Sequence, residues 1–116
     1  MLYGVPVASL GFVRLPAYVN AAKGLLSDED ERDIEQMLIV NPEVGVTIGG
    51  TGGVRKLCVP LQGRGKSGGA RVIYFYRASS ARVYLLYVYK KNEADNLSAA
   101  GKVLMKKLVQ ALESEK

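Results

Sequence analysis

The stretch RVIYFYRASSARVYLLYVY, residues 71–89, decides the fold of this chain. It contains two runs rich in β-branched and aromatic residues, 71–77 and 82–89, and only the four residues ASSA separate them. Such runs favour β-strands, and a link this short joins antiparallel neighbours. The sequence therefore predicts a central β-hairpin.

The hairpin brings basic residues from two parts of the sequence together. In antiparallel strands the end of one strand lies beside the start of its partner, so we expect Lys90 and Lys91 close to Arg71. Side chains alternate between the two faces of a strand, which puts Arg71 on the same face as Ile73 and Phe75. One end of the sheet should therefore be cationic.

Further strands are expected upstream of the hairpin. The candidates are the short, β-branched segments 10–15, 44–48 and 54–61. Arg55 and Lys56 lie at the start of the last of these segments. We expect both residues at the opposite end of this strand from Pro60 and the glycine loop, and so less well placed than Lys90 and Lys91, unless the twist of the sheet brings a long side chain across.

Two helices are expected between the first strand and the others. Pro16 suits the first turn of a helix over 16–26. Ser27 is a candidate N-cap for a second helix, because four acidic residues follow it where the helix dipole favours negative charge. The apolar stripe of this second helix consists of Ile34, Met37 and Leu38. Asn41-Pro42 should end it.

A last helix is expected at the C-terminal end, over 99–114, with Ser98 as its cap. Its expected apolar face consists of Val103, Leu104, Leu108 and Leu112. The whole order is a strand, two helices, a meander of about three strands and a helix. Successive antiparallel strands with segregated helices indicate an α+β fold. We expect one domain over 1–116, with 1–9 as an irregular lead-in.

The composition narrows the possible functions. There are 16 Lys and Arg against 11 Asp and Glu, a net charge of +5, which favours an anionic partner such as nucleic acid. The chain has no histidine and one cysteine, Cys58, which excludes Ser-His and Cys-His catalysis and an internal disulfide and argues against a zinc site. A reducing cytosol fits this cysteine count. No apolar run is long enough to span a membrane, and the N-terminal residues make a poor signal peptide.

The segment GRGKSGGARVIYFY, 63–76, carries the clearest functional signal. Its Gly65-Lys66-Ser67 matches the end of a phosphate-binding P-loop, but Pro60 stands where that motif requires glycine, and a strand follows instead of a helix. The glycine loop GGTGG (49–53) is too short for a dinucleotide fingerprint.

Two interpretations of the basic residues around this segment stay open. Arg64 and Lys66 can act with Arg71, whose forked guanidinium suits a phosphate group. Alternatively, the loop is a solvated turn and Arg71 caps the sheet edge or pairs with an acid such as Glu93.

Tyrosines are concentrated on the two central strands, at positions 74, 76, 84, 87 and 89. Aromatic residues there are first of all sheet formers and core residues. A tyrosine beside the basic cluster could also stack on an RNA base.

Three segments together resemble a known family: GTGGVRKL (50–57), GRGKSGGARVIYFY (63–76) and VYLLYVYKKNEADNLS (83–98). In this order and spacing they resemble the RelE/HigB superfamily of toxins from bacterial type II toxin–antitoxin systems, most of all the HigB2-like subgroup. The resemblance covers roughly residues 12–112. It implies a curved antiparallel sheet of about four to five strands, with two N-terminal helices and a C-terminal helix.

The resemblance also implies an activity: a ribosome-dependent endonuclease that cuts mRNA in the ribosomal A site. The ribose 2′-OH attacks the adjacent phosphate without a metal or another cofactor, and basic residues stabilise the charge that develops. It implies a cytoplasmic protein with a cognate antitoxin as its partner, typically a helix-turn-helix protein.

Residue roles are implied as well. Arg71, Lys91 and Lys66 correspond to the expected catalytic positions, with Arg71 on the scissile phosphate and Lys91 toward the leaving group. The residues expected to contact RNA are Arg64, Lys90, Lys56 and Tyr89. The family often places a tyrosine after the cation at 91, but the segment EADNLS (93–98) has none, so Lys66, Lys91, Tyr89 or the ribosome is left as proton acceptor.

Two other functions fit the same fold. One is a ParE-like inhibitor of DNA gyrase, which would not need the basic constellation around Arg71. The other is a nucleic-acid-binding module without catalysis, whose binding should fall steeply with salt.

Overall fold

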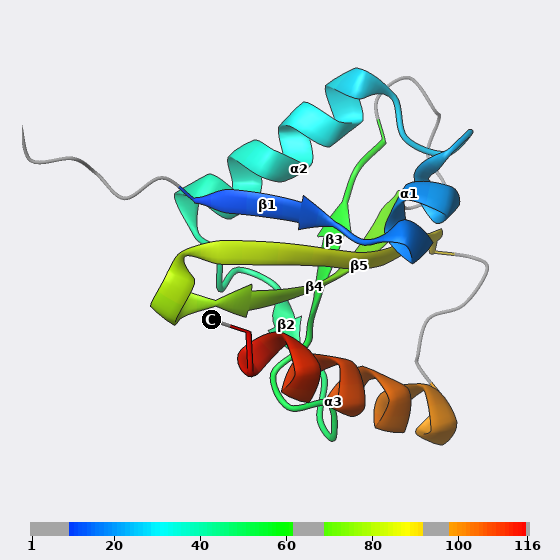
Figure 1. The fold of residues 1–116 in the computed structure, drawn as a ribbon. Helices are drawn as coiled ribbons and strands as arrows, with labels where there is room; N and C mark the ends of the chain where they lie inside the picture. Colours follow the sequence, from blue (N-terminus) through cyan, green and yellow to red (C-terminus); the bar gives the residue numbers. More distant parts are fainter. Residues whose placement is uncertain (1–9, 62–68, 92–97, 116) are drawn as a thin grey trace, which may run out of the picture.

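A five-stranded sheet with helices on both faces forms the centre of the molecule (Figure 1). The computed structural model describes residues 10–61, 69–91 and 98–115. The strands are β1 (Gly11–Arg14), β2 (Val46–Thr47), β3 (Arg55–Val59), β4 (Ala70–Arg77) and β5 (Arg82–Lys90). The helices are α1 (Pro16–Ala22), α2 (Asp28–Val40) and α3 (Ala99–Glu113), with a short 3-10 turn at Ala78–Ser80. The lead-in 1–9 lies outside the described residues.

The strand order is β1-β5-β4-β3-β2. The predicted hairpin is confirmed, because β4 and β5 pair antiparallel from Ala70 opposite Lys90 to Arg77 opposite Arg82. β2, β3 and β4 continue this antiparallel meander. β1, however, runs parallel to β5, so the sheet is mixed and not wholly antiparallel. No short turn connects β1 to β5, so no turn geometry fixes their relative direction.

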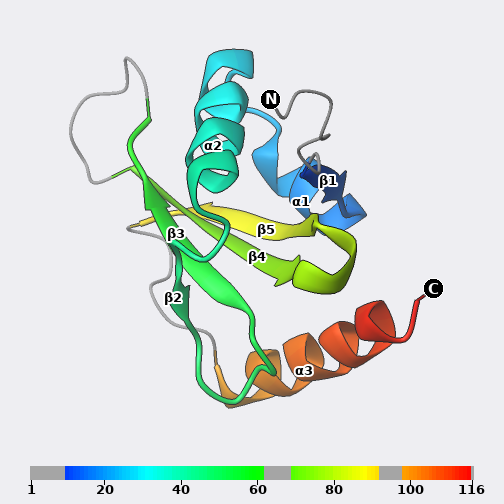
Figure 2. The same ribbon diagram turned by 90° about the vertical axis from the view of Figure 1, so that its left-hand side faces the viewer.

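The sheet separates two hydrophobic cores, with α1 and α2 on one face and α3 on the other (Figures 1 and 2). The α1/α2 core includes Tyr18, Leu38, Val72, Tyr74 and Leu85. The α3 core includes Val54, Ile73, Phe75, Tyr84, Leu86, Tyr89, Val109 and Leu112. Neighbouring residues of β4 enter different cores, as the alternation of side chains on a strand requires.

The helix starts follow from their capping residues. Ser27 accepts a hydrogen bond from the Asp30 N–H at 3.0 Å, and the Asp30 carboxylate accepts one from the Ser27 N–H at 3.0 Å, which completes a capping box. This pairing explains why Asp30 is buried. Ser98 accepts from the Gly101 N–H at 3.0 Å, so the predicted cap of α3 is confirmed.

The expected apolar face of α3 is only half right. Leu112 is buried and Leu108 packs against the α3 core, but Val103 and Leu104 are 53% and 66% exposed. The buried residues of α3 lie in its C-terminal half, where Val109 and Leu112 meet the sheet. The N-terminal half of α3 therefore carries apolar side chains that the sheet does not cover. Helix α1 is also shorter than expected and ends at Ala22.

Candidate nucleic-acid interface

The pairing of β4 with its two neighbours assembles the predicted basic residues. Arg71 lies opposite Tyr89 on β5 and opposite Cys58 on β3. The backbone N–H of Lys91 donates to the Gly69 carbonyl at 3.1 Å. The expectation that residues 90 and 91 lie beside Arg71 is therefore confirmed.

Lys56 lies closer to Arg71 than expected. It pairs with Ile73, two residues from Arg71 and on the same face of the sheet. Lys56 does lie at the opposite end of β3 from Pro60, as expected, but β3 has only five residues, so the side chain still lies near Arg71. We call Lys56, Arg71, Tyr87 and Tyr89 the basic face.

Arg55 and Lys90 have other positions. The Arg55 guanidinium donates to the carbonyls of Glu43 and Gly45, at 2.9 and 2.8 Å, and so holds the chain before β2. Lys90 is exposed opposite Ala70, which belongs to the α1/α2 core. Alternation along the strand places Lys90 on the face opposite to Arg71.

A β-bulge places the tyrosines of β5. Tyr74 pairs with Leu85 while Ile73 pairs with Tyr87, so Leu86 is an extra residue on β5. Without this bulge, Tyr87 would share the face of Leu85. With it, Tyr87 and Tyr89 join the basic face, and their ring centroids lie 6.3 Å apart with an interplanar angle of 33°.

Exposure separates the roles of these two tyrosines. Tyr87 is 41% exposed, whereas Tyr89 is only 6% exposed and belongs to the α3 core. The sequence pointed to Tyr89 as the RNA contact, but Tyr87 offers the accessible ring. The bulge leaves no signal in the alternation of residues, and for that reason sequence reasoning did not single out Tyr87.

Gly69 fixes the point at which the chain enters β4. Its φ is +72°, and a methyl group at its Cα would lie 2.1 Å from the Val59 carbonyl oxygen. Only glycine fits this position. The Gly69 carbonyl also accepts a hydrogen bond from the Lys91 N–H. Gly69 therefore fixes the position of the start of β4 and of the residue that follows β5.

The basic face has the chemistry of a phosphate and base contact. The Arg71 side chain is half-buried, with Nη1 3.4 Å from the Ala70 carbonyl. Arginine and lysine bind phosphate oxygens, and an exposed tyrosine ring can stack on a base. Arg64, Lys66 and Glu93 lie outside the described residues. In the parts that the structure describes, no group of three His, Cys, Asp or Glu residues could hold a metal ion.

A hollow of about 240 Å³ lies over the opposite face of the sheet, beside α1 and α2. It is lined by Arg14, Tyr18, Val19, Ala22, Lys23, Leu26 and Glu31. The Tyr18 hydroxyl in it already donates to Glu31 Oε1 at 2.8 Å, and Arg14 Nε lies 3.6 Å from the same oxygen. The polar groups of this hollow bind one another, so the basic face is the better candidate site.

Comparison with known proteins identifies both a family and a fold. A family model described as the RelE toxin of the RelE / RelB toxin-antitoxin system matches residues 39–116. A double arginine-to-alanine mutant of E. coli toxin RelE in the free state is similar in structure, with a TM-score of 0.55, 14% identity and coverage of 88% of this chain and 97% of that chain. The intact E. coli RelBE toxin-antitoxin complex is also similar, with a TM-score of 0.54 and 16% identity. This match covers 76% of this chain and 100% of that chain. At these identities the two structures show the fold alone.

Proposed function

The chain belongs to the RelE toxin family, and from this membership we propose that it is a ribosome-dependent mRNA endonuclease. The observation that carries the proposal is the basic face, where Lys56, Arg71 and the exposed ring of Tyr87 lie on one face of three neighbouring strands, β3, β4 and β5. A gyrase inhibitor that acts by binding alone would not need such a face. Membership of the HigB2-like subgroup stays a prediction.

The proposed chemistry needs no histidine. The ribose 2′-oxygen attacks the adjacent phosphorus, the bond from phosphorus to the 5′-oxygen breaks, and a 2′,3′-cyclic phosphate and a 5′-hydroxyl result. Arg71 stabilises the negative charge on the phosphoryl oxygens in the transition state. Lys91 acts toward the leaving 5′-oxygen, and Lys66 is a candidate acceptor for the 2′ proton. Much of the rate enhancement then comes from positioning and charge.

The proposed partners follow from the family. The substrate is mRNA in the ribosomal A site, which would place the protein in the cytoplasm. An antitoxin neutralises it, and we expect a helix-turn-helix protein whose neutralising segment complements the net charge of +5. In the described part of the chain, no helix is long and apolar enough to cross a membrane.

Arg71→Ala should abolish most cleavage and leave the protein folded. Removing one preorganised charge-stabilising donor typically lowers the rate by about 10²- to 10³-fold. The measurement is mRNA cleavage in a purified translation system, mapped by primer extension, with and without ribosomes. Arg32→Ala is the matched control, because Arg32 is exposed on α2, on the other side of the sheet.

Each alternative gives a distinct result in this assay. Cuts that require the ribosome and disappear in Arg71→Ala support the nuclease. If folded wild-type protein makes no cuts, gyrase supercoiling and salt-dependent RNA binding should be measured next, since these are the two remaining candidates. A large loss of thermal stability in Arg71→Ala would instead show that Arg71 is structural.

A further inference from the structure

The lysines of α3 lie against the loop between β2 and β3. A methyl group on Gly50 would lie 3.9 Å from Cδ of Lys102, and one on Gly52 would lie 3.8 Å from Cγ of Lys106. The stems of both lysines therefore pass over the glycines of loop 49–53. We call this loop and the two lysines the α3 surface.

Thr51 holds the loop from inside. It is fully buried, its hydroxyl donates to the Ile48 carbonyl at 2.6 Å, and the same oxygen accepts from the Val54 N–H at 3.1 Å. Gly50 and Gly52 are exposed and have φ of +78° and +81°. Within the described ranges, the N–H groups of these two glycines have no hydrogen-bond acceptor. Exposed backbone N–H groups in a glycine turn are suitable donors to phosphate oxygens.

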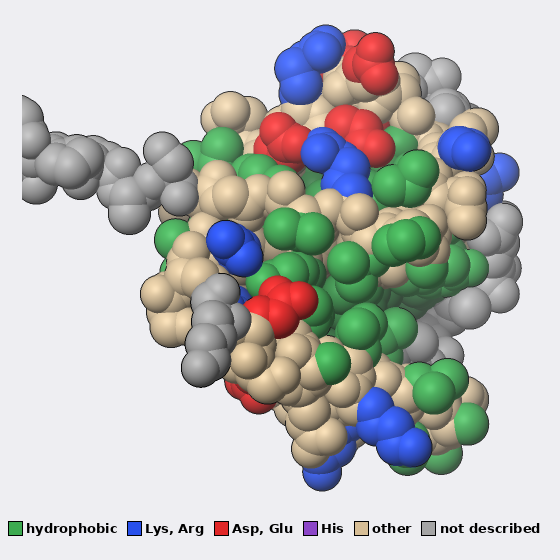
Figure 3. All heavy atoms as spheres, in the orientation of Figure 1, with side chains coloured by type: hydrophobic (Ala, Val, Ile, Leu, Met, Phe, Trp, Pro, Cys, Tyr) green, Lys and Arg blue, Asp and Glu red, His purple; other side chains and the backbone are tan. Residues whose placement is uncertain are grey.

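The described part of the chain does not neutralise the charge on this surface. Among the residues that the structure describes, neither Lys102 nor Lys106 forms an ion pair with a carboxylate. The two residues are four positions apart on one side of α3, about 6 Å along the helix axis. Figure 3 shows basic side chains gathered over α3, at the lower edge of the molecule.

The α3 surface is connected to the basic face through β3. Val54 packs in the α3 core with Val109, and Gly52 approaches the same Val109 side chain, at 3.5 Å from Cγ1 for an added methyl group. Lys56 is the next residue of β3 after Val54 on that face. The lysines of the α3 surface and the two cations of the basic face, Lys56 and Arg71, thus lie on one side of the molecule.

We propose that the α3 surface is a second binding site for RNA phosphates, separate from the residues that perform cleavage. The inference rests on the proposed function, because it takes RNA as the substrate. Lysine ammonium groups beside bare backbone donors match the acceptor oxygens of a phosphate backbone. The surface strengthens and orients RNA binding, and it takes no part in the chemical step. The competing ligand is an acidic protein. Its carboxylates would bind the lysines, and its apolar side chains could pack on Val103 and Leu104, which are exposed on the same helix.

The test measures RNA binding apart from cleavage. The variant Lys102→Gln/Lys106→Gln removes two charges from the α3 surface. The control Lys23→Gln/Arg32→Gln removes two charges from exposed positions of the helical segment on the other face. The probe is a labelled single-stranded RNA with 2′-O-methyl groups, which cannot undergo 2′-OH attack. Fluorescence anisotropy gives the affinity between about 50 and about 200 mM salt.

The expected result is a change in salt dependence. Each phosphate contact on single-stranded RNA contributes about 0.7 to the slope of log affinity against log salt, so the lysine variant should lower that slope by about 1.4 and the control should not. Equal slopes for the two variants would overturn the proposal. A second result would also overturn it: a labelled polyglutamate peptide binds the wild type but not the lysine variant, while the slope for RNA is the same in both proteins. Failure of ribosomal cleavage by wild type, with the slope difference present, would reject the nuclease and not this site.

Discussion

At the scale of single residues, the two tyrosines at the end of β5 show how a small change of register assigns roles. Both lie on the basic face, but Tyr89 is packed in the α3 core while Tyr87 is 41% exposed. A buried ring contributes to stability through its contacts and the area that it removes from water. The exposed ring of Tyr87, on the same face of the sheet as Arg71, is available to a base.

We predict opposite effects for the two alanine variants. Tyr87→Ala should weaken binding of the 2′-O-methyl RNA by about 1–3 kcal/mol, the range for loss of one stacked base, and should leave the thermal melt unchanged. Tyr89→Ala should lower the free energy of unfolding by about 3–5 kcal/mol, as loss of a large buried ring does.

Fluorescence anisotropy and urea denaturation measure the two quantities. Tyr87→Phe is the control, because it keeps the ring, and it should retain most of the affinity. Equal RNA binding by Tyr87→Ala and wild type would show that no base stacks there.

At the scale of elements, the junction between loop and β4 depends on one glycine. Gly69 takes a left-handed conformation, and its Cα faces the Val59 carbonyl so closely that no side chain fits. This conformation brings the chain into β4 beside the end of β3, one residue before Ala70 and two before Arg71. The β5 bulge then adjusts the partner strand.

Gly69→Ala should disrupt this junction. We expect a loss of stability of at least about 1–3 kcal/mol from the strained backbone alone, together with a loss of cleavage, because Arg71 would shift. Urea denaturation and the ribosomal cleavage assay measure the two effects. Gly49→Ala is the control, since nothing lies within 4 Å of its added methyl group and its φ is not in the left-handed region. A Gly69→Ala protein as stable as Gly49→Ala would contradict the role given to Gly69.

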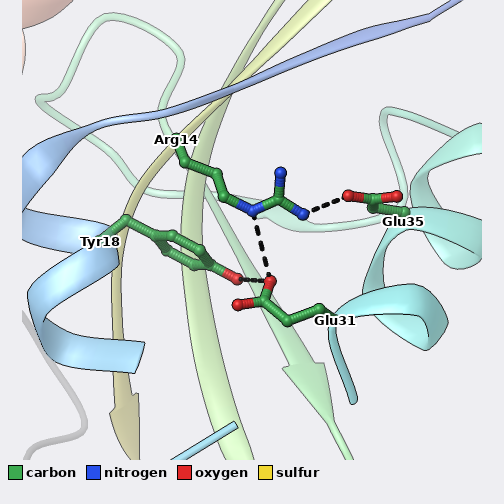
Figure 4. Close-up of polar contacts among 4 residues, drawn as sticks. All are labelled: Arg14, Tyr18, Glu31 and Glu35. Carbon is green, nitrogen blue, oxygen red and sulfur yellow. Dashed lines mark hydrogen bonds and ion pairs between the residues drawn. The ribbon is translucent and has the colours of Figure 1, made fainter. Parts of the chain in front are cut away.

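At the scale of the whole molecule, a polar cluster joins β1 and α1 to α2 (Figure 4). Arg14 from β1 pairs with Glu35 and Glu31 from α2, and the Tyr18 hydroxyl from α1 donates to Glu31. Tyr18 is fully buried. Burial, followed by the hydrogen bond to Glu31, raises the pKa of Tyr18 well above its usual value.

This shift predicts a pH dependence of stability with a defined sign. A tyrosine in the unfolded chain loses its proton at about pH 10, whereas folded Tyr18 keeps it at higher pH. The stability that Tyr18 contributes is therefore fully present below about pH 10 and is lost as pH rises above that value.

Tyr18→Phe should remove this part of the pH dependence. At neutral pH the variant should lose about 1.5–3 kcal/mol, because its partner Glu31 is charged. Above about pH 10 its unfolding free energy should fall less steeply than that of wild type. Urea denaturation at several pH values measures both, with Tyr87→Phe as the exposed control. Parallel curves for Tyr18→Phe and wild type would show that Tyr18 titrates alike in both states.

The sequence by itself determined the features that depend on near neighbours. The β4–β5 hairpin, the N-cap at Ser27 and the cap at Ser98 follow from residues a few positions apart, and all three are confirmed. The placement of Lys91 beside Arg71 followed from the hairpin alone, because antiparallel pairing fixes it. Arg64 and Lys66, which lie outside the described residues, stay as sequence predictions.

Only the tertiary structure decided the features that depend on distant contacts. The parallel direction of β1, the exposure of Val103 and Leu104, and the position of Lys56 all depend on how the sheet packs between its two cores. The bulge at Leu86 shifts every later residue of β5 by one place, and Tyr87 reaches the basic face for that reason. Register and burial depend on packing energies summed over the whole molecule, so no local pattern of residues specifies them.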